Sequence, residues 1–265
     1  MKRISDLIFI LAFTALLLIP SAGMLFFPTT VSYENRNLKE SPHIQDTDGK
    51  LNMSLPDDIS DYVSDHIALK NETVSLFAVL NAGLFSVSAR QNVIYGEDDW
   101  LYYTASTDDY LHKNPISDRK LYAIAHNMLL MQEYCDLLGK KAVFAIAPNK
   151  NSLYGEHMPK AYRDARAGSL SEYSDLDRLR PFLIAEGVNH ADLTELFESR
   201  DETLYYKKDS HWNNKGALVV YRELMQRAGV QPLFFDEDAP VISKNFVGDL
   251  NKMLYGMAAK PQEWL

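Results

Sequence analysis

Cysteine is almost absent from this chain of 265 residues, which contains a single one, Cys135. One thiol excludes an intrachain disulfide and any cysteine-rich zinc or iron–sulfur site, and it is compatible with an exported domain that avoids thiols. The 12 glycines are dispersed and form no phosphate-binding loop, and the histidines show neither His-x-His nor His-Glu-x-x-His spacing. The sequence therefore predicts no cofactor and no metal centre.

Positive charge is also scarce. Lys and Arg number 27 against 36 Asp and Glu, which gives a formal net charge of -9 at pH 7, and the basic residues form no long run. Such a surface does not attract nucleic-acid phosphates, so nucleic acid is not an expected partner. With 46% hydrophobic and 24% charged residues, the chain is expected to bury a full core rather than to be disordered.

The one long apolar run lies at the N-terminus, where Ile8 to Phe27 carries no charge. Its length is about that of a bilayer-crossing helix, which predicts export. Two interpretations stay open: a signal peptide cleaved near Ser21–Gly23, or an uncleaved anchor, which the apolar residues continuing past that point favour. Because MKR precedes the run and no further basic residue occurs before Arg36, we expect a single-pass protein of the cell membrane with its globular part outside the cytoplasm.

The chain beyond this run divides into a linker and a globular domain. After a membrane segment at 1–28, residues 29–58 are polar and have little periodicity, which indicates a juxtamembrane linker. Residues 59–265 are expected to form the domain. Apolar residues at helical spacing over 58–85 predict one or two helices near its start, and the β-rich runs that flank GEDD within 92–104 predict a hairpin.

Helix and strand patterns then alternate. The spacing predicts helices over 117–139 and 172–186, and between them the apolar letters AVFAIA predict a strand buried on both faces. A second short strand is expected in GVNHADL, before a helix that begins at Thr194. This alternation is typical of a mostly parallel α/β sheet, in which ligands gather at the carboxyl ends of the strands. That rule nominates three polar places as neighbours: Asn149-Lys150, the Asp192 region and Asp209-Ser210-His211.

The stretch LYYKKDSHWNNKGA carries the chemistry. A carboxylate on one ring nitrogen of a histidine holds the tautomer whose other nitrogen serves as a general base, and Asp209 and His211 could form that pair if the segment is extended. Trp212 could then wall the site, and Asn213 or Asn214 could cap the following helix. The spacing also fits a capping aspartate beside a surface histidine or, less well, a metal site, and Lys150 fits a solvated strand end as well as a substrate contact.

Several segments in this order resemble one family. The segments YENRNLKESP, SDHIALKNE, NVIYGEDDWLYY, AVFAIAPNKNSLYGEHMP, GVNHADL, LYYKKDSHWNNKGA and FVGDL, from about residue 33 to 250, are similar to the SGNH-hydrolase-like domain of the alginate O-acetyltransferase AlgX/AlgJ group and its DHHW relatives. The resemblance implies a three-layer α/β sandwich and a Ser-His-Asp triad that transfers acetyl groups at polysaccharide hydroxyls. It makes His211 the base and Asp209 the residue that orients it. The candidate substrate contacts, which come from the strand-end rule and from aromatic stacking, are Trp212, Tyr206, Asn149 and Lys150.

The sequence departs from this family at the nucleophile. The family's serine lies in a Gly-Asp-Ser or Gly-Thr-Ser block after the Asp-x-His-Trp motif, and no such block occurs here, because VGDL has Leu250 where a nucleophile would stand. Ser106, Ser152 and Ser210 lack the strand-turn-helix context of a nucleophile, and Ser210 is expected to point away from its two neighbours. We therefore expect a C-terminally truncated member whose sheet is incomplete.

Two functions follow from these observations. The first is an extracytoplasmic O-acetyltransferase or acetylesterase that acts on cell-surface or exopolysaccharide hydroxyls, with the polysaccharide acceptor and an acetyl donor, such as a membrane O-acetyltransferase protein, as partners. The second is a noncatalytic carbohydrate-binding or assembly subunit of a polysaccharide export or modification system. Its candidate sugar platforms are Trp100, Trp212 and the tyrosine pairs at 102–103 and 205–206, although such aromatics more often belong to a core.

Overall fold

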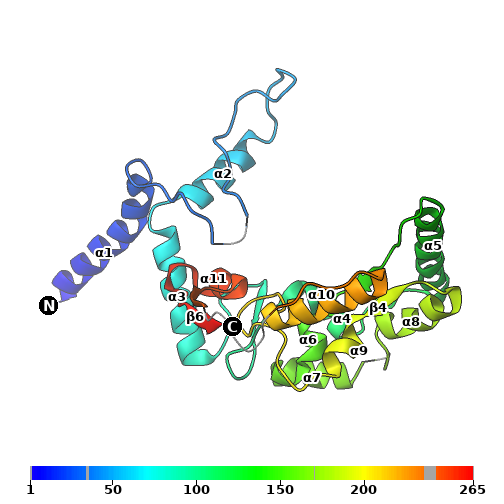
Figure 1. Cartoon of the computed structure of the whole chain (residues 1–265). Helices are drawn as coiled ribbons and strands as arrows, with labels where there is room; N and C mark the ends of the chain where they lie inside the picture. The colour runs from blue at the N-terminus through cyan, green and yellow to red at the C-terminus, as the bar shows by residue number, and fades with distance from the viewer. Residues whose placement is uncertain (1, 34–35, 170, 236–242, 265) are drawn as a thin grey trace. The chain divides into compact units, whose positions relative to one another are not determined.

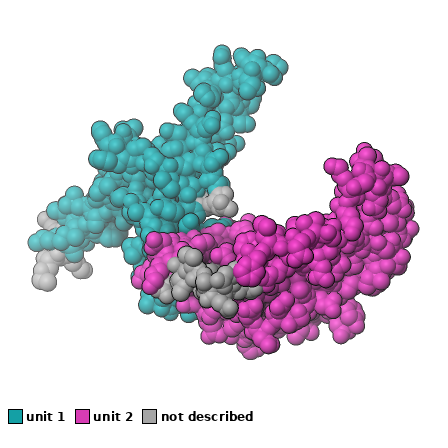
Figure 2. Space-filling model, viewed as in Figure 1, with its two compact units in different colours: residues 1–89, 252–259 teal, residues 90–251, 260–265 magenta. Residues whose placement is uncertain are grey.

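The computed structural model describes residues 2–33, 36–169, 171–235 and 243–264. The chain forms two compact units, which Figure 2 shows in separate colours: residues 1–89 with 252–259, and residues 90–251 with 260–265. Both helices expected near the start of the globular domain belong to the first unit. The domain boundary at residue 59 stays a prediction.

The first unit is helical. Its elements are α1 (Lys2–Gly23), α2 (Leu55–His66), α3 (Lys70–Phe85) and the short 3-10 helix η3 (Gly256–Ala258). Within α1, the stretch Ile4–Gly23 has a mean hydropathy of 2.2 and no buried residues, so by length and composition it could cross a membrane.

Two helices, not one, follow the linker. The first begins at Leu55 rather than at residue 58, because Pro56 occupies its first turn, where a missing N–H costs nothing, and two aspartates beside it complement the helix dipole. The break before α3 falls at Leu69, whose φ of 62° is left-handed and cannot continue a helix.

Asp65 is the buried charge of the first unit. The guanidinium of Arg36 donates to both of its carboxylate oxygens, at 2.7 and 2.6 Å, and the Lys39 amide and Lys70 ammonium each donate at 3.0 Å. The hydrogen bond from Arg36 is the largest influence on the pKa of Asp65 and, with those from Lys39 and Lys70, holds it well below its usual range despite burial. This carboxylate therefore ties the linker to both α2 and α3.

We expect Asp65→Asn to destabilise the first unit by about 2 kcal/mol, because two cations lose a buried partner. A carboxyl group whose pKa is lowered on folding contributes stability above its unfolded pKa of about 3.9, and that contribution disappears as the pH falls through the folded pKa. Wild type and variant should therefore differ at pH 7 and converge below about pH 4. Hydrogen exchange of α2 amides across this pH range measures the difference in stability between wild type and variant. A difference that does not shrink as the pH falls below about 4 would contradict the prediction.

The second unit alternates strands and helices. Its strands are β1 (Val93–Tyr95), β2 (Leu101–Tyr103), β3 (Phe144–Ile146), β4 (His190–Asp192), β5 (Ser243–Phe246) and β6 (Gln262–Trp264). Its α-helices are α4 (Thr107–Tyr110), α5 (Asp118–Leu137), α6 (Lys150–Leu153), α7 (Lys160–Ala167), α8 (Asp175–Glu186), α9 (Leu193–Glu198), α10 (Asn214–Ala228) and the start of α11 (Asp249–Tyr255), with 3-10 turns η1 (Thr104–Ser106) and η2 (Gly155–His157).

The strands confirm the expected α/β alternation only in part. The predicted hairpin is present, because β1 and β2 pair antiparallel, and β3 pairs with β4 in parallel, Phe144 opposite His190 and Ile146 opposite Asp192. The expectation that β3 is buried on both faces is wrong, since its residues are half-buried or exposed. Among the described residues β3 has β4 as its single strand neighbour, and no described strand pairs with its other edge.

Two apolar clusters support this unit. The helices α5 and α8 run side by side and close one cluster over β3 (Figure 1). A larger cluster joins the hairpin to α9 and α10, and its buried members are Ile94, Trp100, Tyr102, Tyr110, Leu111, Met158, Ala191, Leu193, Phe197, Leu204, Tyr205 and Val220. This larger cluster adjoins the segment that carries the Asp-x-His motif, because its members Leu204 and Tyr205 lead into that motif.

Candidate functional site

A tight turn presents the Asp-x-His motif. Tyr205 and Trp212 form an isolated antiparallel bridge, and the Tyr206 amide donates to the His211 carbonyl at 3.2 Å, so the intervening residues fold back on themselves. The segment is therefore a turn and not the extended segment for which the sequence analysis expected this pairing. The His211 amide closes the turn by donating to Asp209 Oδ1 at 2.9 Å, a local bond that aspartate makes readily.

The side chains of Asp209 and His211 form a carboxylate–imidazole pair. His211 Nδ1 lies 2.7 Å from Asp209 Oδ1, and the Asp249 amide donates to Asp209 Oδ2 at 2.7 Å. Burial is the largest influence on the pKa of Asp209 and raises it, but the hydrogen bonds from Asp249 and His211 outweigh burial and leave this pKa lowered. An ionised Asp209 holds the proton of the neutral imidazole on Nδ1, which leaves Nε2 as the basic nitrogen.

Exposure separates the two partners. The Asp209 side chain is 8% exposed, whereas that of His211 is 75% exposed. The carboxylate is thus fixed inside the protein while the imidazole faces outward. This is the arrangement that a general base requires when it acts on a group approaching from outside.

Ser210 contacts the wrong side of the imidazole for a nucleophile. Its hydroxyl lies 3.3 Å from His211 Nδ1 and donates to Asp249 Oδ2, and its amide donates to Asp249 Oδ1 at 2.7 Å. The expectation that Ser210 points away from both neighbours is wrong, because the turn brings its hydroxyl beside the ring. Since Nδ1 already faces Asp209, His211 cannot take the Ser210 proton there.

Asp249 is the part of the site that sequence reasoning missed. It begins α11 and contacts the turn through its amide on Asp209 and its carboxylate on Ser210. The preceding residue must be glycine for this approach, because a Cβ at Gly248 would lie 2.2 Å from the Lys208 carbonyl oxygen. In the sequence, the glycine and aspartate of FVGDL were the signal that could have predicted this contact.

Lys150 supports the turn from beneath. Its ammonium group donates to the carbonyl oxygens of Leu101 at 2.7 Å, Lys207 at 2.7 Å and Asp209 at 3.0 Å, and the residue is 6% exposed. Burial lowers its pKa to about 7, against the opposing influence of the Asp209 and Asp249 charges. Lys150 is therefore neither a solvated strand-end lysine nor placed to contact a substrate, because its three donors are used inside the protein.

Most of the aromatic candidates belong to the core, whereas Tyr103 is exposed. Trp100, Tyr102 and Tyr205 are nearly inaccessible, so the sugar platforms proposed for them are wrong. Tyr206 is also buried and stacks on Phe246, with the ring centroids 4.7 Å apart.

Trp212 is half-buried and packs edge-on against Phe197 and Tyr205. It therefore braces the turn more than it walls a site. The neighbouring Asn213 caps α10 through its side chain, which accepts from the Gly216 amide at 3.0 Å, and this confirms the expected helix start.

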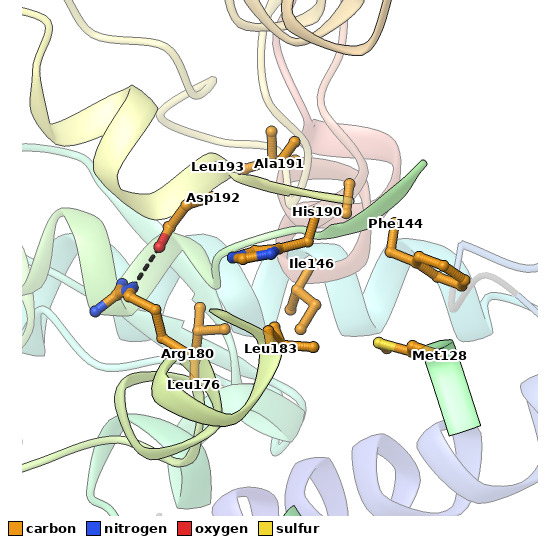
Figure 3. Close-up of a pocket in the computed structure, with 11 residues that line it drawn as sticks. Met128, Phe144, Ile146, Leu176, Arg180, Leu183, His190, Ala191, Asp192 and Leu193 are labelled. Atoms are coloured by element: carbon orange, nitrogen blue, oxygen red, sulfur yellow. Dashed lines mark hydrogen bonds and ion pairs between the residues drawn. The ribbon is translucent and has the colours of Figure 1, made fainter. Parts of the chain in front are cut away.

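The other two strand-end candidates, Asn149 and Asp192, have different partners in the structure. Asn149 donates to Asp109 Oδ2 at 2.7 Å. Asp192 instead pairs with Arg180 beside a small cavity of about 10 Å³ between β3, β4 and α8, which has room for about one water molecule (Figure 3). Asp192 also caps α9 by accepting from the Glu195 amide at 3.1 Å, so its role is structural.

Metal binding is the other chemistry open to this site. One ligand atom from each of Asp209, His211 and Asp249 lies within 4.8 Å of the others. Both carboxylates already accept hydrogen bonds at each oxygen, from the backbone of this turn, from Ser210 and from the α11 N-terminus. A cation bound at His211 Nδ1 would displace the contact of this nitrogen with Asp209, so the arrangement favours proton transfer.

Comparison with known proteins gives the family context. Residues 93–261 match a family model described as SGNH hydrolase-like domain, acetyltransferase AlgX. Two curated relatives, both named probable alginate O-acetylase AlgJ, are each 29% identical to this chain. The relative from Pseudomonas syringae pv. tomato aligns over 169 residues, 62% of this chain and 40% of its own length. The relative from Pseudomonas aeruginosa aligns over 180 residues, 66% of this chain and 42% of its own length. This chain therefore spans about two fifths of the length of these relatives.

Two solved structures are similar at low identity. The O-acetyltransferase domain of Pseudomonas putida AlgJ has a TM-score of 0.40 at 19% identity, covering 66% of this chain and 63% of that one. Bacillus cereus PatB1 has a TM-score of 0.42 at 17% identity, covering 64% of this chain and 56% of that one.

Proposed function

Because this chain belongs to the SGNH hydrolase-like AlgX acetyltransferase family, we propose that Asp209 and His211 supply the base of an O-acetyl transfer to polysaccharide hydroxyls. The observation that carries the proposal is the 2.7 Å contact between a buried, ionised carboxylate and Nδ1 of an outward-facing imidazole. In acyl transfer by a Ser-His-Asp triad, that contact fixes the tautomer, and Nε2 then removes the proton of the attacking hydroxyl.

The nucleophile in this proposal lies outside the described residues. Within the described part of the chain, the hydroxyl recorded beside His211 is that of Ser210, which faces Nδ1 and donates to Asp249. A serine from a further segment would have to approach Nε2 within hydrogen-bond reach. Backbone amides beside that serine would supply the oxyanion hole.

The setting of the reaction is part of the same proposal. In it, α1 anchors the protein in the cell membrane as a single pass, with the globular part on the extracytoplasmic side, where exported polysaccharides are modified. The names of the relatives support a polysaccharide acceptor. An acetyl donor, such as a membrane O-acetyltransferase protein, would load the serine.

Hydrolysis of an activated acetyl ester tests this function. We compare the 265-residue chain in detergent micelles with a version extended by the downstream codons of its gene. The chain alone should show no turnover that a serine-directed fluorophosphonate blocks, because no hydroxyl of the described residues is recorded at Nε2 for the imidazole to activate. The extended version should show such turnover and lose it with His211→Ala.

A noncatalytic carbohydrate-binding or assembly subunit is the second candidate function. It is favoured by the absence, among the described residues, of a recorded hydroxyl partner for His211 Nε2. A stop codon directly after codon 265, with no serine-dependent turnover in cells or in purified protein, would favour this second function. Serine-dependent turnover by the unextended chain would contradict our placement of the nucleophile.

A further inference from the structure

A buried lysine beneath the Asp209–His211 turn is a titratable group that the proposed reaction does not use. The ammonium group of Lys150 donates to three backbone carbonyl oxygens, those of Leu101 and Lys207 at 2.7 Å each and that of Asp209 at 3.0 Å. An ammonium group has three N–H donors and no acceptor, so each donor has one carbonyl oxygen as its partner. The charged form of this lysine therefore fits the acceptors around it.

Two of these three carbonyl oxygens belong to the entry of the turn. Those of Lys207 and Asp209 lie on either side of residue 208, and the third, that of Leu101, belongs to β2. Lys150 thus ties the start of the turn to the hairpin. Because the carboxylate of Asp209 contacts His211 Nδ1 at 2.7 Å, a contact that fixes the Asp209 backbone also fixes the direction of the imidazole.

The neutral form of the lysine fits the same place less well. An amine has two N–H donors and a lone pair, so one of the three carbonyl oxygens would lose its donor and face the lone pair. The contact with Asp209 is the longest of the three, and it is the one that we expect to be released. The nitrogen would stay enclosed, because Lys150 is 6% exposed and the ring centroids of Trp100 and Tyr102 lie 5.0 and 5.3 Å from it.

The groups that face Lys150 act on its charge in opposite directions. Burial is the largest influence and lowers its pKa to about 7, whereas the carboxylates of Asp209 and Asp249 oppose that change. The Tyr102 hydroxyl stays neutral, because burial raises its pKa well above its usual range. Both forms of the lysine are therefore populated near neutral pH.

The other charged groups nearby have partners of their own. The Lys208 ammonium pairs with Asp99 at 3.3 Å, and the Lys207 ammonium lies 5.9 Å from the centroid of the Trp100 ring. His157 stacks on that ring and pairs with a surface aspartate. None of these groups appears among the recorded influences on the pKa of Lys150.

We propose that Lys150 is a positioning residue for His211, and that its ammonium form holds the Asp209 backbone in place while its neutral form releases it. The proposal deepens the proposed function, because it names the group that aligns the base of that reaction. It concerns order within the turn, so it can be tested on this chain without the nucleophile.

A positioning role and a purely structural role give opposite pH dependences. The pKa of Lys150 is about 7 in the folded chain, and that of an exposed lysine is about 10.4. The unfolded chain therefore binds more protons between these two values, so the contribution of Lys150 to the free energy of unfolding rises with pH in this window. If the turn followed global stability, its order would rise as well. The proposal predicts that its order falls, because the neutral amine leaves one carbonyl contact unmade.

Selective isotope labelling isolates the peptide that carries this contact. Asp209-Ser210 is the single Asp-Ser pair in the sequence, so carbonyl-labelled aspartate and amide-labelled serine give one NMR cross-peak for it. The Ser210 amide donates to Asp249 Oδ1 at 2.7 Å, and its protection from hydrogen exchange reports the order of the turn. In the full chain in detergent micelles, we expect its protection factor, corrected for intrinsic exchange, to fall about fivefold between about pH 6 and pH 8.5. The midpoint should lie near pH 7.

Three variants assign this change. Lys150→Met should show low protection at every pH, and Lys150→Arg should keep high protection throughout, because a guanidinium does not lose its charge in this range. Lys208→Met removes the neighbouring ammonium that pairs with Asp99, and it should keep the wild-type pH dependence. A fall that persists in Lys150→Met overturns the proposal. So does wild-type protection that stays constant, or that rises with pH in parallel with stability to urea, and these two results do not depend on the folding of any variant.

His211→Ala separates this inference from the proposed function. Histidines in general change charge in the same pH range, so a fall caused by the imidazole would disappear in this variant and overturn the proposal. We expect the fall to remain, because the recorded contacts of the Lys150 ammonium do not include the imidazole. A pH-dependent turn in a protein whose extended form shows no His211-dependent acetyl transfer would keep this inference and remove the catalytic proposal. Acetyl transfer that depends on His211, without the pH-dependent turn, would do the reverse.

Discussion

His211→Ala should lower the kcat of acetyl transfer by about 10⁴- to 10⁶-fold in the extended protein. The imidazole is exposed, so its removal leaves the core intact, and the loss would come from the missing base. Asp209→Asn should cost about 10⁴-fold, because an amide favours the wrong imidazole tautomer and provides no charge opposite the imidazolium.

The measurement is the initial rate on an activated acetyl ester, with the circular dichroism spectrum as a check of folding. Asp201→Asn is the matched control, since this exposed aspartate lies in the loop before the turn and should leave kcat unchanged within about twofold. Because the two members of the pair act as a unit, the double variant should be no slower than His211→Ala alone. A rate that falls further, or full activity after His211→Ala, would show that the pair is not the base.

Lys150→Met should destabilise the second unit by about 3 kcal/mol, the largest expected change in stability. Methionine preserves the apolar stem but removes the ammonium donor from the carbonyl oxygens of Leu101, Lys207 and Asp209, of which that of Lys207 keeps the Leu101 amide, and each group left unsatisfied costs about 1–3 kcal/mol. Removing the buried charge relieves part of this cost. Urea unfolding followed by tryptophan fluorescence measures the change, because Trp100 lies 5.0 Å from the ammonium group.

Lys160→Met is the control for this substitution. Its ammonium pairs with Asp164 on the surface of α7, at 2.6 Å, and both side chains are largely exposed. An exposed i,i+4 pair contributes about 0.3–0.5 kcal/mol, so the variant should unfold close to wild type. Equal effects of the two substitutions would mean that the carbonyl contacts of Lys150 do not stabilise the turn.

Local sequence signals predicted which segments form helices and strands better than they predicted how deeply those segments are buried. The helix predicted over residues 117–139 appears as α5, and Gly139, with a φ of 68°, follows its end. The hairpin at GEDD was also predictable, because turn residues and β-rich flanks are adjacent in sequence. The burial of β3 was not, since burial depends on neighbours that no local pattern specifies.

The site shows the same limit. Asp209 and His211 were predictable because a two-residue spacing and a resemblance both pointed to them. Their geometry was not, because the turn depends on a lysine and an aspartate distant in sequence, and Lys150 in particular reads as a surface residue by its type alone. Sequence reasoning therefore identified the two members of the carboxylate–imidazole pair but not the residues that hold them.

The contacts around this turn impose an order on synthesis. Asp209 meets the Asp249 amide across 40 residues of chain, and Lys150 meets the Asp209 carbonyl across 59. Closing loops of this length costs entropy that a short peptide cannot recover. A nascent chain whose DSHW motif has just emerged from the ribosome would thus carry a disordered histidine. The imidazole would become an oriented base only after the segment at Gly248 has emerged and folded back onto it.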